Sequence, residues 1–265
     1  MRRLQNNKYF FSVEGETEEL YFKHLKNLIL AEEGRIANPV FVIQKDSPAK
    51  VAKKIPMILP CSITAVFDVE DADADHRKRF ENTLKEMSEA EKLGKSIKFD
   101  LGYSNIDFEL WIILHKKDLF GTVGSKAQYL KNINQVYGTK FEALREYKTE
   151  RNFSQILSKI TLDDVKSAIV RAEKITKQRM SEGNPIRTCG YEWFDKNPAL
   201  SVHCVIKKIL SECGGGKKQA LRAALEPAEG VADKPTKRRE SALLAGVIRG
   251  ATWLGSEGKA FPSYL

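Results

Sequence analysis

Acidic residues gather at one point of this 265-residue chain, directly after a short run of apolar residues. Two carboxylates about 4 Å apart repel each other by roughly 1 kcal/mol in water and by about 4 kcal/mol at an effective dielectric constant of about 20. Such a cluster needs a compensating cation, and hydrated Mg²⁺ suits carboxylate oxygens. The alternative is an acidic turn that only caps the next helix. The apolar run is residues 63–67, and the acids that follow are Asp68, Glu70, Asp71, Asp73 and Asp75.

The apolar run is typical of a buried strand, because it is short and rich in β-branched residues. Similar runs occur at residues 9–13, 39–43 and 97–101, and segments with helical periodicity separate them. Strands that alternate with helices predict an α/β fold. We therefore expect a mainly parallel four-stranded sheet flanked by helices, followed by a helical C-terminal part.

Polar residues follow three of these predicted strands. Glu14 follows the first, Asp68 follows the third, and Ser104 with Asn105 follows the fourth. In open α/β sheets, ligands bind outside the carboxyl ends of the strands, so these side chains are expected at one edge. A further acid, Glu109, lies in the apolar helix predicted at 107–115, where a lone carboxyl costs several kcal/mol unless it is paired or bound to a metal.

Other acids have simpler explanations. Glu16, Glu18 and Glu19 are expected to interact with the dipole of a helix that Thr17 caps. Asp73 and Asp75 are expected to cap the helix after the acidic cluster. Thr161 with Asp164 predicts the start of another helix, and Asn197-Pro198 predicts the start of the last one.

The chain divides into three predicted parts: an α/β catalytic domain (1–118), a helical region packed on or beside it (119–216) and a weakly ordered basic tail (217–265). The whole chain carries a net charge of +9, of which the tail contributes +4 through nine Lys or Arg and five acids. An excess of Lys and Arg over Asp and Glu favours binding to a polyanionic partner such as nucleic acid.

Nothing in the sequence indicates secretion or a membrane span. The four cysteines form no Cys-x-x-Cys pair and match no common zinc spacing, which favours a reducing compartment. The N-terminus lacks the apolar core of a signal peptide, and no apolar run reaches the roughly 20 residues of a membrane helix. A cytoplasmic protein is expected.

Three motifs occur in an order that resembles the RloB-like family of Toprim-type proteins from bacterial defence and restriction-linked loci. They are Phe11-Ser12-Val13-Glu14-Gly15-Glu16-Thr17-Glu18, Val66-Phe67-Asp68-Val69-Glu70-Asp71, and the run from Ser104 through Glu109 to His115. The segment Asn197 to His203 resembles the C-terminal helix of that family.

The resemblance implies a Toprim-like core that cleaves DNA or RNA with Mg²⁺, with Mn²⁺ as the alternative ion. Glu14 would be a catalytic or metal-associated glutamate and Asp68 a principal metal ligand. Glu70 stands where the family usually has Asp, so either Glu70 or Asp71 would supply the second ligand. Glu109 would be catalytic, and Ser104, Asn105 and His115 would contact substrate.

Two function classes follow. The first is a Mg²⁺-dependent nuclease in anti-phage defence, acting with other proteins of a defence locus or as a homo-oligomer. The alternative is a non-catalytic subunit that binds nucleic acid or senses an effector and uses the acids for a structural metal. A phosphatase with an Asp nucleophile would need Asp-x-Asp-Gly-Thr, which the residues after Asp68 do not match.

Overall fold

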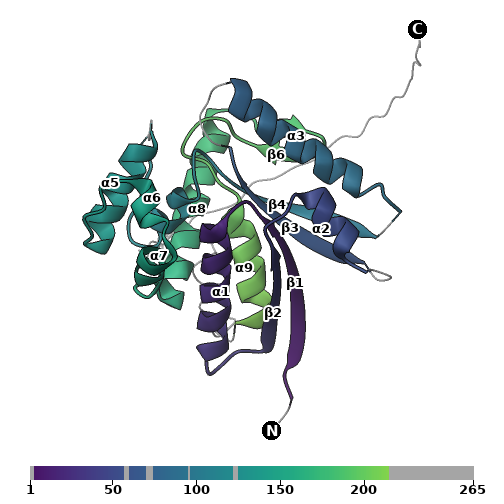
Figure 1. Ribbon diagram of the computed structural model, residues 1–265, viewed down its shortest axis with the longest axis horizontal. Coiled ribbons are helices and arrows are strands. Elements are labelled where there is room, and N and C mark those ends of the chain that lie inside the picture. The colour runs from purple at the N-terminus through teal and green to yellow at the C-terminus, as the bar shows by residue number, and fades with distance from the viewer. Residues whose placement is uncertain (1–2, 57–59, 70–73, 95, 122–124, 215–265) are drawn as a thin grey trace, which may run out of the picture. The chain divides into compact units, whose positions relative to one another are not determined.

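A four-stranded parallel sheet forms the centre of the protein in the computed structural model, which describes residues 3–56, 60–69, 74–94, 96–121 and 125–214 (Figure 1). The strand order is β2-β1-β3-β4. The predicted α/β fold class is confirmed. The strands are β1 (Gln5–Val13), β2 (Ala37–Gln44), β3 (Cys61–Asp68) and β4 (Ile97–Ser104).

Helices connect and cover the strands. Around the sheet they are α1 (Glu16–Ala31), α2 (Pro48–Lys54), α3 (Ala74–Ala90), α4 (Glu109–Leu114) and α9 (Val202–Cys213). The intervening region contains α5 (Lys126–Tyr137), α6 (Leu144–Tyr147), α7 (Glu150–Leu157), α8 (Leu162–Glu182) and a short antiparallel hairpin of β5 (Ile186–Thr188) and β6 (Tyr191–Trp193).

The sheet separates two hydrophobic cores, because successive side chains along a strand point to opposite faces. Phe11 and Val66 belong to the core that α1, α4 and α9 cover. Ile63 belongs to the core on the other face, with residues of α2 and α3. Figure 1 shows α1 and α9 together on one side of the strands and α2 with α3 on the other.

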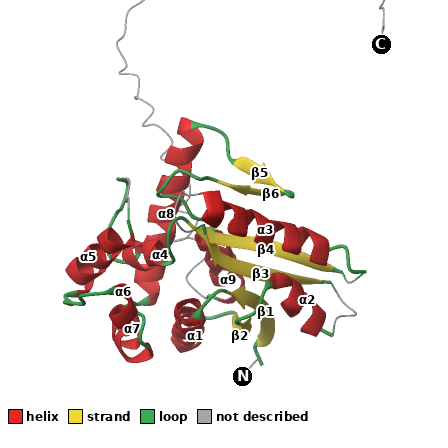
Figure 2. Ribbon diagram, turned by 45° about the horizontal axis from the view of Figure 1, so that its top comes forward, coloured by secondary structure: helices red, strands yellow, loops and turns green. Residues whose placement is uncertain are grey.

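The helical region shares the first core with the sheet. Side chains of α5, α7 and α8 are buried with those of α1 and α4, across the boundary predicted at residue 118. The β5–β6 hairpin instead joins the second core, beside α3 (Figure 2). Its Trp193 ring packs edge-on against Phe80 at 5.1 Å between centroids. The region 119–216 is therefore helical apart from this hairpin, and the predicted tail lies outside the described residues.

Two predicted helix starts differ from the structure. Gly15, rather than Thr17, precedes the first residue of α1, and its N–H donates to Glu18 Oε2 at 2.9 Å. The last helix begins at Val202 rather than at Asn197-Pro198. By contrast, the predicted Thr161 cap of α8 is confirmed, since its hydroxyl accepts from the N–H of Asp164.

The segment before α9 is extended because it pairs with the end of β4. The N–H of Asn105 donates to the carbonyl of Ala199 at 2.9 Å, and the N–H of Ser201 donates to that of Tyr103. Behind this pairing, α9 lies close to the sheet, since a Cβ at Gly102 would be in ordinary van der Waals contact with the Cα of Val202 at 3.5 Å. The turn at 197–201 is thus fixed next to the carboxyl end of β4.

Candidate functional site

The candidate site lies where the connections from β1 and β3 diverge. From β1 the chain passes through α1 to β2, whereas from β3 it passes through α3 to β4 on the other side of β1. Loops that diverge at such a switch point leave a crevice at the carboxyl ends of the strands. The structure brings Glu14 and Asp68 together there, with the Asp68 N–H donating to Glu14 Oε2 at 3.2 Å.

The loop after β4 adds two buried acids. Asp107 is 2% exposed and Glu109 is 0% exposed, the latter as the first residue of α4. Between β4 and these acids, Ile106 has a φ of 65°. A β-branched residue rarely adopts this conformation, which costs on the order of 1–3 kcal/mol and persists only where the surroundings enforce it. The paired segment at Ala199 provides that enforcement on one side.

Two lysines from the helical region reach the same acids. Lys148 Nζ lies 3.0 Å from Asp107 Oδ1 and 3.2 Å from Glu109 Oε1. Lys126 Nζ lies 3.5 Å from Asp107 Oδ2. The cluster therefore combines acids from the sheet edge with two lysines from the helical region that follows α4.

The carboxyl groups of Asp68, Glu109 and Glu18 all resist ionisation. Burial, followed by the charges of Asp107 and of other nearby acids, raises the pKa of Asp68 well above its usual value. Burial and Asp107 do the same to Glu109. Burial raises the pKa of Glu18 to about 7, although Lys148 lowers it. Because burial is the largest cause of each shift, a further cation at this edge would favour the ionised form of these acids.

Asp107 is the exception within the cluster. Burial alone would raise its pKa, but the adjacent Glu109 carboxyl and the charges of Lys148 and Lys126 hold the pKa well below the usual range. The two acids in turn keep the pKa of Lys148 above its ordinary value despite burial. An ionised Asp107 paired with Lys148 is therefore the stable centre of the cluster.

Several buried polar atoms here have no hydrogen-bond partner among the described residues. They are Ser104 Oγ, Asn105 Oδ1, Asp107 Oδ2, both carboxyl oxygens of Glu109 and the Tyr147 hydroxyl. Buried polar atoms are normally hydrogen-bonded, so unpaired atoms concentrated in one place require an explanation. A bound ligand or cation that accepts these oxygens as partners supplies one.

Ser104 and Asn105 lie beside the acids, and Asn105 holds the loop in place. Its side-chain amide donates to the carbonyl of Phe194 at 2.9 Å, and its carbonyl accepts from the Tyr129 hydroxyl at 3.1 Å. The carbonyl of Ser104 accepts from the N–H of Val69 at 2.9 Å. Contact of either residue with substrate stays a prediction.

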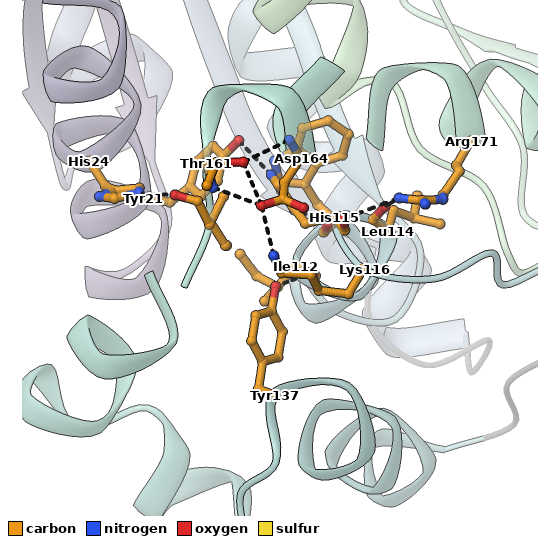
Figure 3. Close-up of polar contacts among 12 residues, drawn as sticks. Tyr21, His24, Ile112, Leu114, His115, Lys116, Tyr137, Thr161, Asp164 and Arg171 are labelled. Carbon is orange, nitrogen blue, oxygen red and sulfur yellow. Dashed lines mark hydrogen bonds and ion pairs between the residues drawn. The ribbon is translucent and has the colours of Figure 1, made fainter. Parts of the chain in front are cut away.

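The structure places His115 at the other end of α4, where it is 1% exposed. Its Nδ1 lies 2.9 Å from the carbonyl of Trp111 and must donate, so Nε2 accepts from the Tyr21 hydroxyl at 3.1 Å (Figure 3). Burial lowers the pKa of His115 to about 3 and keeps the ring neutral. Both ring nitrogens are occupied and the ring is buried in the core, and contact of His115 with substrate stays a prediction.

Donors from the helical region complete this end of α4. Arg171 Nη1 donates to the carbonyls of Leu114 at 2.7 Å and His115 at 3.1 Å. The Tyr137 hydroxyl donates to the carbonyl of Ile112 at 2.8 Å, and Figure 3 shows these side chains converging on the helix end. A six-residue helix has little stability of its own, so these contacts and its apolar packing fix where Glu109 lies.

The remaining predicted ligands, Glu70 and Asp71, lie outside the described residues, as does Asp73. Asp75 is in the first turn of α3 rather than before it. In the part of the chain that the structure describes, no group of three acidic, His or Cys side chains is arranged as a metal cage. The donors nevertheless fit Mg²⁺ in chemistry, since they are carboxylate oxygens with two unpaired atoms on a fully buried Glu109.

Sequence reasoning missed three members of the cluster as site residues. Glu18 was assigned to the helix dipole, although an acid four positions after Glu14 lies on the first turn facing the same edge. Asp107 was expected only as the first residue of the apolar helix at 107–115. Lys148 gave no signal, because only tertiary packing carries it to the acids.

The comparison with known families covers most of the chain. Residues 9–209 match the description "RloB-like protein". The chain belongs to the RloB-like family. The match spans all three motifs and the segment before α9, so the predicted family is confirmed. No curated protein and no solved structure matches this RloB-like chain. Among the described residues, no helix is long and apolar enough to cross a membrane.

Proposed function

We propose that this RloB-like protein is a Mg²⁺-dependent nuclease that hydrolyses phosphodiester bonds of DNA or RNA. The observation that carries the proposal is the convergence of Glu14, Asp68 and Glu109 from three elements onto one sheet edge. Both buried oxygens of Glu109 lack a hydrogen bond among the described residues, and Oε1 lies 3.2 Å from Lys148 Nζ. Raised carboxyl pKa values support it, because they arise from burial and then from repulsion between the acids, and a divalent cation would stabilise the ionised carboxylates against both.

Asp68 and Glu109 would hold the cation, with Glu14 beside Asp68. A bound Mg²⁺ lowers the pKa of a coordinated water and stabilises a leaving oxygen. The chain itself supplies the orientation. β1, β3 and the packed helix α4 are rigid supports, and the Asp68 N–H fixes the Glu14 carboxyl at 3.2 Å. Tyr129 and Tyr147 are buried near the acids, and the charges of Glu109 and Asp107 act on both hydroxyls.

Glu14 is the best candidate for moving a proton. Its side chain is the exposed member of the pair with Asp68, so it can reach a water or a leaving oxygen at the mouth of the site. Asp68 and Glu109 are more enclosed and suit the role of holding a cation. In this division, Glu14 acts as general acid or base.

A second function has support of its own. Lys148 and Lys126 already pair with Asp107, so basic side chains lie at this edge beside the acids. This arrangement also suits a non-catalytic defence subunit that binds nucleic acid or senses an effector. Such a protein would retain salt-sensitive nucleic-acid binding when the acids are replaced, and it would show no turnover.

The test is cleavage of plasmid DNA, single-stranded DNA and RNA with Mg²⁺ or Mn²⁺. We expect metal-dependent cleavage that falls at least about a hundredfold in Asp68→Asn and in Glu14→Gln. Glu89→Gln on the exposed side of α3 is the matched control and should cleave normally. Cleavage that survives both site substitutions, or none from the native protein with any substrate, would refute the nuclease.

We propose that the protein acts in the cytoplasm. Its substrate there would be foreign or phage nucleic acid. Other proteins of a defence locus, or further copies of the chain, are its proposed partners. Size-exclusion chromatography with light scattering, with and without nucleic acid, tests the homo-oligomer.

A further inference from the structure

Lys148 occupies the middle of the acidic cluster. Its ammonium bridges Asp107 at 3.0 Å and Glu109 at 3.2 Å, and its charge also acts on Glu18 and Asp68. These are the same groups that would surround a divalent cation. Among the described residues, Lys148 is also the cation that contacts Glu109.

The backbone of Lys148 is fixed by its position between two helices. Its N–H donates to the carbonyl of Leu144 at 2.8 Å, which ends α6. Thr149 then caps α7 by accepting from the N–H of Asn152. The preceding Tyr147 is fully buried, with its ring 5.4 Å from that of Phe153. The helical region therefore delivers the lysine to the site from a rigid support.

The Lys148 side chain is partly exposed, whereas the acids with which it pairs are buried. The Lys148 side chain is 36% exposed, whereas Asp107 and Glu109 are 3% and 0% exposed. Lysine has four rotatable bonds and a compact charge that hydrates well. The ammonium can swing toward solvent while both carboxylates stay in place.

Asp107 and Glu109 differ in the ion pairs that they retain when the Lys148 ammonium moves away. Asp107 keeps its ion pair with Lys126 at 3.5 Å. No second ion pair to Glu109 is present among the described residues, and both Glu109 oxygens also lack hydrogen bonds. Departure of Lys148 thus exposes an uncompensated carboxylate to any cation that enters.

We propose that Lys148 is a placeholder for the divalent cation: it pairs with Asp107 and Glu109 in the metal-free protein and moves off when the cation binds. The inference rests on the proposed metal site. It makes Lys148 a positioning residue that keeps the buried acids apart from each other and ready for metal. Once released at the mouth of the site, its ammonium becomes a partner for a phosphate oxygen of the substrate.

The first test is Mn²⁺ binding to the full-length protein, measured from the electron paramagnetic resonance signal of free Mn²⁺. Lys148→Met removes the competing charge and should bind Mn²⁺ about tenfold more tightly, as expected for an ion pair of roughly 1.4 kcal/mol. Lys148→Arg keeps the charge and should stay within about threefold of the native affinity. Lys116→Met, which breaks the ion pair to Asp164 away from the site, is the matched control. Unchanged or weaker binding by Lys148→Met would overturn the proposal.

The second test needs no variant and so does not depend on folding. Reductive methylation followed by peptide mass spectrometry reports how accessible each lysine amine is. Saturating Mn²⁺ should increase labelling of Lys148 severalfold and leave Lys116 unchanged. Equal or reduced labelling of Lys148 would contradict its release.

The outcomes separate this inference from the nuclease proposal. Tighter metal binding by Lys148→Met without any cleavage supports the placeholder and removes the nuclease. Metal-dependent cleavage supports the nuclease. If Lys148→Met then binds Mn²⁺ no more tightly and Mn²⁺ does not increase labelling of Lys148, the placeholder is wrong. If neither the native protein nor Lys148→Met binds Mn²⁺, both proposals are wrong.

Discussion

The two ends of α4 differ in hydrogen bonding. At the C-terminal end, side chains donate hydrogen bonds to several carbonyl groups, whereas at the N-terminal end the buried carboxyl oxygens of Glu109 accept no hydrogen bond from the described residues. Arg171 and Tyr137 donate to three carbonyls at the C-terminal end, and the His115 ring is satisfied at both nitrogens. At the N-terminal end, both oxygens of Glu109 lack a hydrogen bond among the described residues. These two environments lie within one six-residue helix.

The difference indicates a division of labour between stability and function. Buried groups without hydrogen bonds, and acids with raised pKa values, lower the stability of the folded protein. They persist where a bound ligand supplies the missing hydrogen bonds or the opposite charge. The satisfied end holds the helix in place, and the unsatisfied end is the part available for chemistry. Substitutions at the two ends should therefore have opposite effects.

The largest expected effect is at the unsatisfied end. Glu109→Gln keeps the shape of the side chain but removes its charge, so metal-dependent cleavage should fall at least about a hundredfold. The free energy of unfolding should stay the same or rise, because burial disfavours an ionised carboxyl here and the amide of Gln is neutral at every pH. Cleavage assays and urea denaturation of the same preparation measure both. A large loss of stability would show that Glu109 is a structural ion-pair partner of Lys148 rather than a metal ligand.

The next effect concerns the pH dependence of stability. The folded-state pKa of Glu18 is raised to about 7, above its unfolded value. The contribution of Glu18 to the free energy of unfolding is therefore fully present at low pH and is lost as the pH rises toward and through about 7. The shift corresponds to about 3 kcal/mol at most. Metal-free native protein should lose stability over this range, and Glu18→Gln should flatten the curve.

Urea denaturation across the pH range measures this contribution. Asp68 and Glu109 have shifts of the same sign, so part of the slope should remain in the variant. Saturating Mg²⁺ should reduce the slope in the native protein, because a cation favours the ionised acids. A native curve that rises between about pH 5 and pH 7 would contradict the raised pKa values.

The smallest effect is expected at the satisfied end. Arg171→Ala leaves the carbonyls of Leu114 and His115 without their donor, and the free energy of unfolding should fall by about 2 kcal/mol. Mn²⁺ affinity should change less than about twofold, since the helix retains its packing and the Tyr137 contact. A collapse of metal affinity in this variant would mean that the two ends of α4 are coupled.

The parallel sheet and the acids at its edge were predictable from sequence because both depend on short-range patterns. A run such as residues 63–67 is long enough for one strand, and the acid after it must lie at the carboxyl end. Glu14 and Asp68 came together for this reason. The local rule failed at Asn197-Pro198, because the residues that follow, Ala199 to Ser201, pair with the end of β4 and the residue after it before α9 begins at Val202.

The sequence by itself determined the α/β class, the family and the first acids of the cluster. Only the tertiary structure decided that His115 belongs to the core, that Glu18 and Asp107 join the acids, and that Lys148 lies between them. The physical reason is distance along the chain. Burial and charge pairing between residues about 40 positions apart depend on how helices pack, and no local pattern of residue types encodes that packing.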